Sequence, residues 1–252
     1  MTRRALWTLP PLLLVAGFFV YPLTLTALQS GGAWTRVATS PEFGRTVLRT
    51  LEIAVCATIG CLLLGTFFAL VLTYAPFPGA RAVARLIDTV LAFPSYLIAL
   101  AFTVLYGSAG VVDGLGIATL DFIYTPAGLV FAEITFYTPF VMRPLLAAFG
   151  QVPPAQLEVA ASLGARPWRV VRQVLLPEAL PALAAGGGLT LLLTLNEFGL
   201  VLFIGAKDVT TLPMLVYTKG LVTFDQAGAA VAAVAQVALS LTVYSLYRRV
   251  AR

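Results

Sequence analysis

The chain has 252 residues, of which 60% are hydrophobic and only 11% are charged. Soluble domains carry about a quarter charged residues, so this composition excludes a water-exposed globular protein and indicates a membrane protein. Histidine is absent from the sequence, which excludes Ser-His-Asp and Cys-His catalysis and the usual histidine-containing metal sites. We therefore expect no catalytic residue, no metal and no cofactor in this chain.

Six apolar segments are long enough to cross a bilayer, which takes about 20 residues. In chain order they are 5–35, 53–80, 89–112, 126–149, 182–205 and 226–247. The fourth contains Glu133 and Arg143, and the fifth contains Glu197. The first follows two arginines, as a signal peptide would, but it is too long and no cleavage site of small residues follows it. The sequence thus predicts an all-α membrane protein with about six transmembrane helices and an uncleaved first span.

Six spans place both termini on one side, and the positive-inside rule assigns that side as cytoplasmic. Ten cations then lie inside: Arg3, Arg4, Arg81, Arg85, Arg166, Arg169, Arg172, Arg248, Arg249 and Arg252. Five lie outside: Arg36, Arg45, Arg49, Lys207 and Lys219. This bias accounts for the net charge of +5, so the basic residues require no nucleic-acid partner.

The loop between the fourth and fifth spans is charged and contains several prolines. Pro154 favours the start of a first helix, and Gly164 is expected to end it in a left-handed conformation. Pro167 is expected to start a second helix, and Pro177 to end it, because proline lacks the backbone donor. In the second helix, valines and a leucine form one side and arginines form the other, so the loop is predicted to be an amphipathic helical hairpin. An amphipathic hairpin that merely lies on lipid headgroups is the alternative.

The spacing within this loop favours a more specific interpretation. Six residues fit a pattern of Glu-Ala-Ala, three residues, Gly, nine residues and Ile-x-Leu-Pro: Glu158, Ala160, Gly164, Val174, Leu176 and Pro177. The departures are Val159 for the middle alanine and Val174 for isoleucine. This pattern resembles the cytoplasmic signature of permease subunits of binding-protein-dependent ABC importers. The resemblance continues through TFYTPFVMRPLLAAFG, LTLNEFGLVLFIG and TTLPMLVYTKGLVTFDQAGAAVAAV, and covers most of the chain from the second span onward.

The resemblance implies a single permease domain over residues 1–252 with the type I importer fold, and a cytoplasmic coupling loop over residues 150–181 within it. This loop would dock in a groove on a separate ABC ATPase subunit, with Arg166 and Arg169 in its polar rim. Because ATP would be hydrolysed on that subunit, the chain itself is not expected to be an enzyme. The other expected partners are membrane lipid, a second permease subunit in a homodimer or heterodimer, and a periplasmic or lipid-anchored solute-binding protein, all at a bacterial inner membrane.

Polar residues in the fifth span are candidates for the translocation path. Asn196, Glu197 and Thr194 could line it, and a carboxylate there would suit an ammonium-bearing substrate. The alternative, which we favour, is that these side chains form hydrogen bonds between helices and fix their packing.

The substrate is predicted from resemblance. The Asn196–Gly199 segment with its following residues resembles permeases for 2-aminoethylphosphonate, so the expected solute is that compound or another phosphonate. Another oxyanion, iron, thiamine and polyamines are the alternatives. An ion-gradient-driven secondary transporter is the alternative of another class, but it predicts an internal repeat that the sequence does not show.

Overall fold

The computed structural model describes residues 3–75, 77–107, 110–115, 121–205 and 209–250, and every regular element in those ranges is a helix. The predicted topology places Lys207 on the outer side of the membrane and Arg252 on the cytoplasmic side. Both residues lie outside the described ranges. The chain forms two compact units. Unit 1 comprises Met1–Thr50 and Thr210–Leu241, and unit 2 comprises Leu51–Val209 and Thr242–Arg252.

Within the described ranges, four helical stretches are each long and apolar enough to cross a membrane. They are Trp7–Ser30, α4 (Pro41–Tyr74), α8 (Pro126–Phe149) and α15 (Gln226–Val250). Two bent helix pairs bring the total to as many as six spans: α5 (Ala80–Val90) with α6 (Ser95–Tyr106), and Pro167–Glu178 with α12 (Leu180–Leu195). The predicted all-α membrane fold with about six spans is confirmed, although the bounds differ in the second, third and fifth spans.

The third span is where the sequence prediction fails most clearly. Residues 89–112 were expected to form one span, but α5 and α6 meet at a bend of 110°. Pro94 lies at the break with φ −62° and ψ 144°, because it has no backbone donor and its ring keeps the preceding residue out of the helical region. With 12 residues, α6 is about 18 Å long and cannot cross the bilayer alone. It is followed by the short helix α7 (Val111–Gly114) and the 3₁₀ turn η2 (Asp121–Tyr124).

The second and fifth spans also differ from prediction. α4 begins at Pro41 and ends at Tyr74, so both its start and its end come earlier in the chain than those of the predicted span, residues 53–80. The fifth span was expected as one helix over 182–205, but α12 ends at Leu195 and a separate helix α13 (Gly199–Ile204) follows. The break is stabilised by side chains: Asn196 Nδ2 donates to the Leu192 carbonyl at 2.7 Å, and the Leu200 amide donates to Glu197 Oε1 at 2.8 Å. Such bonds satisfy the backbone groups that a helix end leaves without intrahelical partners.

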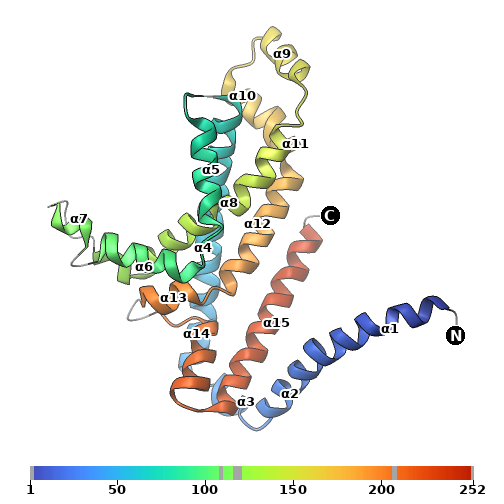
Figure 1. Ribbon diagram of the computed structural model, residues 1–252, viewed down its shortest axis with the longest axis vertical. Coiled ribbons are helices and arrows are strands. Elements are labelled where there is room, and N and C mark those ends of the chain that lie inside the picture. Colours follow the sequence, from blue (N-terminus) through green and yellow to red (C-terminus); the bar gives the residue numbers. More distant parts are fainter. Residues whose placement is uncertain (1–2, 76, 108–109, 116–120, 206–208, 251–252) are drawn as a thin grey trace. The chain divides into compact units, whose positions relative to one another are not determined.

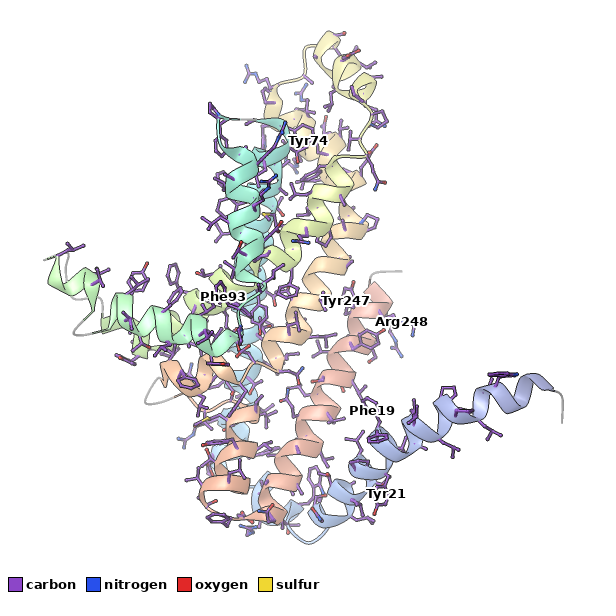
Figure 2. The ribbon with its side chains drawn as sticks, viewed as in Figure 1. Phe19, Tyr21, Tyr74, Phe93, Tyr247 and Arg248 are labelled. Atoms are coloured by element: carbon purple, nitrogen blue, oxygen red, sulfur yellow. The ribbon has the colours of Figure 1, made fainter. Side chains whose placement is uncertain are left out.

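Unit 1 contains the first span and a small core. The first span runs through α1 (Arg3–Val15), a π-helical turn η1 (Ala16–Val20) and α2 (Tyr21–Ser30). Its apolar side chains point outward, as Figure 2 shows for Phe19 and Tyr21, which are 65% and 61% exposed. The core joins α3 (Trp34–Ala38), the start of α4, α14 (Leu212–Tyr217) and the first turns of α15 around buried Val231 and Leu215. The Leu212 amide donates to Thr50 Oγ1 at 2.9 Å and so fixes the start of α14.

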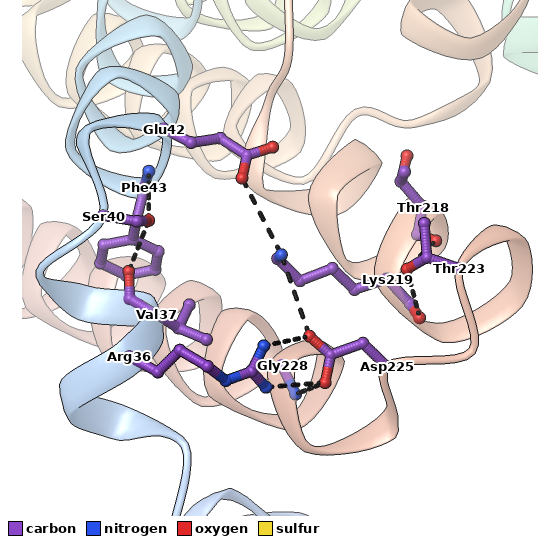
Figure 3. Close-up of polar contacts among 10 residues, drawn as sticks. All are labelled: Arg36, Val37, Ser40, Glu42, Phe43, Thr218, Lys219, Thr223, Asp225 and Gly228. Carbon is purple, nitrogen blue, oxygen red and sulfur yellow. Dashed lines mark hydrogen bonds and ion pairs between the residues drawn. The ribbon is translucent and has the colours of Figure 1, made fainter.

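An ion-pair cluster lies at one edge of unit 1 (Figure 3). Both terminal guanidinium nitrogens of Arg36 in α3 donate to the Asp225 carboxylate, at 2.9 and 3.1 Å. Lys219, in the π-helical turn η4 (Thr218–Val222), lies 4.0 Å from Asp225 and 3.9 Å from Glu42. Asp225 also accepts the Gly228 amide at 3.0 Å, so it caps the start of α15. The Arg36 guanidinium and the Gly228 amide lower the pKa of Asp225 below its ordinary value of 3.8.

Unit 2 is built around α8 and α12, which lie side by side (Figure 1). A glycine permits their close approach: a Cβ on Gly186 of α12 would lie only 3.1 Å from the Val141 Cα of α8. The fully buried side chains of α8 include Val141, Met142 and Leu145. Small residues let membrane helices approach closely where the hydrophobic effect gives no driving force, so this contact fixes the position of α12.

Candidate functional site

The charged loop forms the predicted hairpin and lies at the end of unit 2 where α8 ends (Figure 1). Its first helix, α9 (Pro154–Ser162), begins at Pro154 as predicted. Gly164 has φ +72°, so the predicted left-handed residue is confirmed. The Gly164 amide donates to the Ala161 carbonyl at 2.9 Å, and the Ala165 amide to the Ala160 carbonyl at 3.0 Å. These two bonds form a Schellman motif, which ends the helix and fixes the direction of the following chain.

The second helix of the hairpin begins as expected but does not end as expected. It runs through α10 (Pro167–Val170), a π-helical turn η3 (Val171–Leu175) and α11 (Leu176–Glu178). The prediction that Pro177 ends this helix is therefore wrong. Directly before the proline, the Leu176 amide donates to the Val171 carbonyl, as in a π-helix. The backbone therefore leaves the α-helical hydrogen-bond register, in which the proline ring would clash with the carbonyl one turn earlier. The helix bends by 70° only after Glu178, at the junction with α12.

The two faces of the hairpin differ in exposure. Glu158, Gly164, Arg166, Arg169 and Pro177 are exposed, whereas Ala160, Val174 and Leu176 are half-buried. Three apolar side chains are strongly exposed: Leu163 at 82% and Trp168 at 69%, which the motif did not include, and Val159 at 59%, which replaces the motif's middle alanine. A sequence signal for Trp168 existed, since a tryptophan beside Pro167 in a polar loop has no predicted core to enter. The hairpin therefore presents apolar side chains beside arginines.

The candidate path residues occupy different environments. Asn196 is exposed, whereas Thr194 and Glu197 are buried within unit 2. Thr194 Oγ1 lies 3.0 Å from the Thr190 carbonyl oxygen and 3.5 Å from Thr58 Oγ1 of α4. These hydroxyls link α12 to α4 through polar contacts between the helices.

Glu197 contacts two elements through its two oxygens. Oε1 accepts the Leu200 amide of α13, and Oε2 accepts the hydroxyl of Tyr137 in α8. Tyr137 is a residue to which the sequence assigned no role, although it follows Glu133 by one helical turn on α8. Glu133 is 1% exposed, and no hydrogen-bond partner is seen for its Oε2 among the described residues. The contacts of Glu197 favour the packing alternative, because both oxygens already hold helices together.

Comparison with known proteins identifies the family. The profile described as "Binding-protein-dependent transport system inner membrane component" matches residues 61–252. The Salmonella typhimurium candidate 2-aminoethylphosphonate transport system permease protein PhnU is 48% identical, with the alignment covering 98% of this chain and 92% of PhnU. The sulfate transport system permease protein CysT of Escherichia coli is 32% identical, over 93% of this chain and 88% of CysT.

Solved structures agree in fold. A chain of a bacterial alginate ABC transporter, crystallised in complex with an alginate-bound periplasmic protein, superposes with a TM-score of 0.84 at 17% identity, covering 98% of this chain and 93% of that one. A chain of the MetNI methionine ABC transporter in an inward-facing conformation gives a TM-score of 0.65 at 21% identity over 82% of this chain. The chain belongs to the family of binding-protein-dependent transport system inner membrane components, and it is a permease subunit of an ABC importer.

Proposed function

We propose that this permease forms the translocation path for 2-aminoethylphosphonate or another phosphonate. The observation that carries the proposal is the 48% identity to PhnU across nearly the whole of both chains. The sulfate permease CysT is also related along most of its length, but at 32% identity. Sulfate, another tetrahedral oxyanion, is therefore the second candidate.

The hairpin is proposed to be the coupling loop, over residues 150–181, that docks on an ABC ATPase subunit. The proposed contacts are Glu158, Ala160, Gly164, Arg166, Arg169, Val174, Leu176 and Pro177. We add Val159, Leu163 and Trp168 to this proposed contact, because their apolar side chains are exposed. Tryptophan and arginine dominate binding energy in protein interfaces, and an amphipathic helix is suited to a groove, so Trp168 with Arg169 would anchor this contact.

Coupling requires that a movement of the hairpin reach the spans. Two features support a rigid connection: the Schellman motif at Gly164, and the run of helix from Pro167 to Glu178 that joins α12 with no intervening loop. Ala179, at the junction, is 1% exposed and Leu175 is 3% exposed, so both are packed against the rest of unit 2. A displacement of the hairpin would thus be transmitted to α12 and the spans packed on it.

The assembly proposed for this permease has two ATPase subunits, a second permease subunit that is a copy or a relative, and a periplasmic or lipid-anchored binding protein. ATP would be hydrolysed on the ATPase subunits, and this chain would contribute no catalytic residue. Both termini and the hairpin would be cytoplasmic, following the distribution of arginines. Residues 1–252 would act as a single permease domain. Thr194, Asn196 and Glu197 remain candidate path residues, with Glu197 better placed to fix packing.

The substrate is tested with the whole complex in proteoliposomes and with the binding protein encoded beside this gene. Calorimetry on the binding protein should give micromolar affinity for 2-aminoethylphosphonate and little heat with sulfate or iron. Uptake into the vesicles should require ATP, the ATPase subunits and the binding protein together. Micromolar binding of sulfate with no response to phosphonates would reject the phosphonate in favour of the second candidate.

A further inference from the structure

An apolar cleft lies between the end of α4 and the inner side of the hairpin. It encloses about 460 Å³ and lies wholly within unit 2. α4 contributes Leu70, Val71 and Tyr74 to its walls, α9 contributes Leu157 and Ala161, and α10 contributes Val170. Figure 2 shows Tyr74 at the end of unit 2 that carries the hairpin. The cleft thus adjoins the element that is proposed to receive movement from the ATPase.

The sequence builds the cleft from helical spacing and small side chains. Leu70 and Tyr74 are one turn apart on α4, and Leu157 and Ala161 are one turn apart on α9, so each pair lies on one helix face. Ala161 leaves space where a larger residue would fill the gap. The hydroxyl of Tyr74 donates to the Phe149 carbonyl at 3.0 Å, which leaves its ring to form the wall. The lining therefore suits a hydrocarbon ligand.

The cleft opens outward, because Leu175 is the only buried residue among those that line it. Open apolar surface of this kind marks a site that is covered by lipid or by another molecule. Two exposed arginines lie next to lining residues in the sequence: Arg172 directly follows Val171, and Arg166 lies between Ala165 and Pro167. Among the described residues, neither arginine forms an ion pair. An occupant with an apolar chain and a negative head would complement both features.

We propose that this cleft binds one acyl chain of an anionic phospholipid, with the lipid phosphate held by Arg172. The chemistry follows from the lining and from the flanking charge, since basic residues beside grooves on the cytoplasmic side of membrane proteins bind anionic head groups. The inference rests on the proposed cytoplasmic side of the hairpin. A lipid in this position lies between α4 and the hairpin, so its presence would set how tightly ATP hydrolysis is coupled to transport.

The test uses the whole complex purified from membranes, with bound lipid measured by native mass spectrometry after exchange into phosphatidylcholine with or without phosphatidylglycerol. Wild type should retain phosphatidylglycerol in preference to phosphatidylcholine. Arg172→Gln should weaken retention about fivefold, the effect expected of one cation near a membrane surface. Ala161→Phe should weaken retention, because the added ring occupies part of the cleft. Ala155→Phe, at an exposed position of the same helix, and Arg248→Gln on α15 are matched controls that should behave as wild type.

A second measurement needs no substitution. Phosphatidylglycerol carrying a photoreactive group on its acyl chain should label peptides that contain Leu70–Tyr74 or Leu157–Ala161 in the wild-type complex. Equal retention of both lipids, equal retention by Ala161→Phe, or labelling confined to other spans would overturn the proposal. Lipid retention does not depend on which solute is imported, so a wrong substrate would appear in the uptake assay and leave this result unchanged.

Discussion

The left-handed glycine of the hairpin gives a quantitative prediction. Gly164 has φ +72°, and a Cβ built there would have no neighbouring atom within 4 Å. Gly164→Ala therefore costs only the backbone term, about 1–2 kcal/mol for an L-residue in the left-handed region. If that cost falls on the docked form of the hairpin, affinity for the ATPase subunit should fall about 5- to 30-fold.

Two further substitutions at Gly164 grade the effect. Gly164→Asn should cost less, since asparagine tolerates the left-handed conformation. Gly164→Pro should cost more, because it also removes the amide that donates to Ala161 and imposes a negative φ. Membrane insertion should be normal in each case, since the hairpin lies between spans. Affinity is measured by titrating the ATPase subunit onto the solubilised permease, with transport followed in parallel.

Gly44→Ala is the matched control for this series. Gly44 also has open space around a Cβ, but its φ is not positive, so alanine should be neutral or slightly stabilising in α4. Wild-type affinity for the ATPase in both the alanine and the proline variant of Gly164 would refute the assignment of this hairpin as the coupling element.

Three other predictions follow from the structure. In a cysteine-free background, a cysteine replacing Asp113 should react with an impermeant thiol reagent in intact cells and one replacing Arg166 should not; labelling at Arg166 would reverse the topology. Glu197→Ala should lower the free energy of unfolding by about 1–3 kcal/mol, because alanine accepts neither the Leu200 amide nor the Tyr137 hydroxyl; an unchanged melting temperature with altered uptake would support the path alternative. The lowered pKa of Asp225 means that its contact with Arg36 is complete above the ordinary carboxyl pKa of 3.8 and is lost as pH falls through the lower folded-state value. The difference in melting temperature between wild type and Asp225→Asn should therefore persist from neutral pH to pH ~5 and shrink only below pH ~4; a loss already near neutral pH would contradict this.

Features that depend on neighbouring residues were predictable from the sequence. The length of α8 follows from an apolar run, and its observed bounds match the predicted residues 126–149. Gly164 and Pro154 set the end and the start of α9, because backbone conformation is decided by the residue itself and its hydrogen bonds one turn away. The spacing motif and the family were readable for the same reason, since the motif lies within one loop.

Features that depend on packing were decided by the tertiary structure. Pro94 lies in a break between two helices and Pro177 lies within a helix, although both interrupt apolar runs. A π turn before Pro177 absorbs the missing hydrogen bond, and packing of Leu175 and Ala179 keeps the helix in place. Glu197 and Tyr137 are 60 residues apart, so their contact exists only because α8 and α12 lie together. The cleft beneath the hairpin is likewise made by three helices, and no single segment encodes it. The sequence determined the helical class, the bounds of α8 and the motif because these arise from local chemistry, whereas the breaks in the third and fifth spans, the buried contacts and the cleft arise from which helices meet.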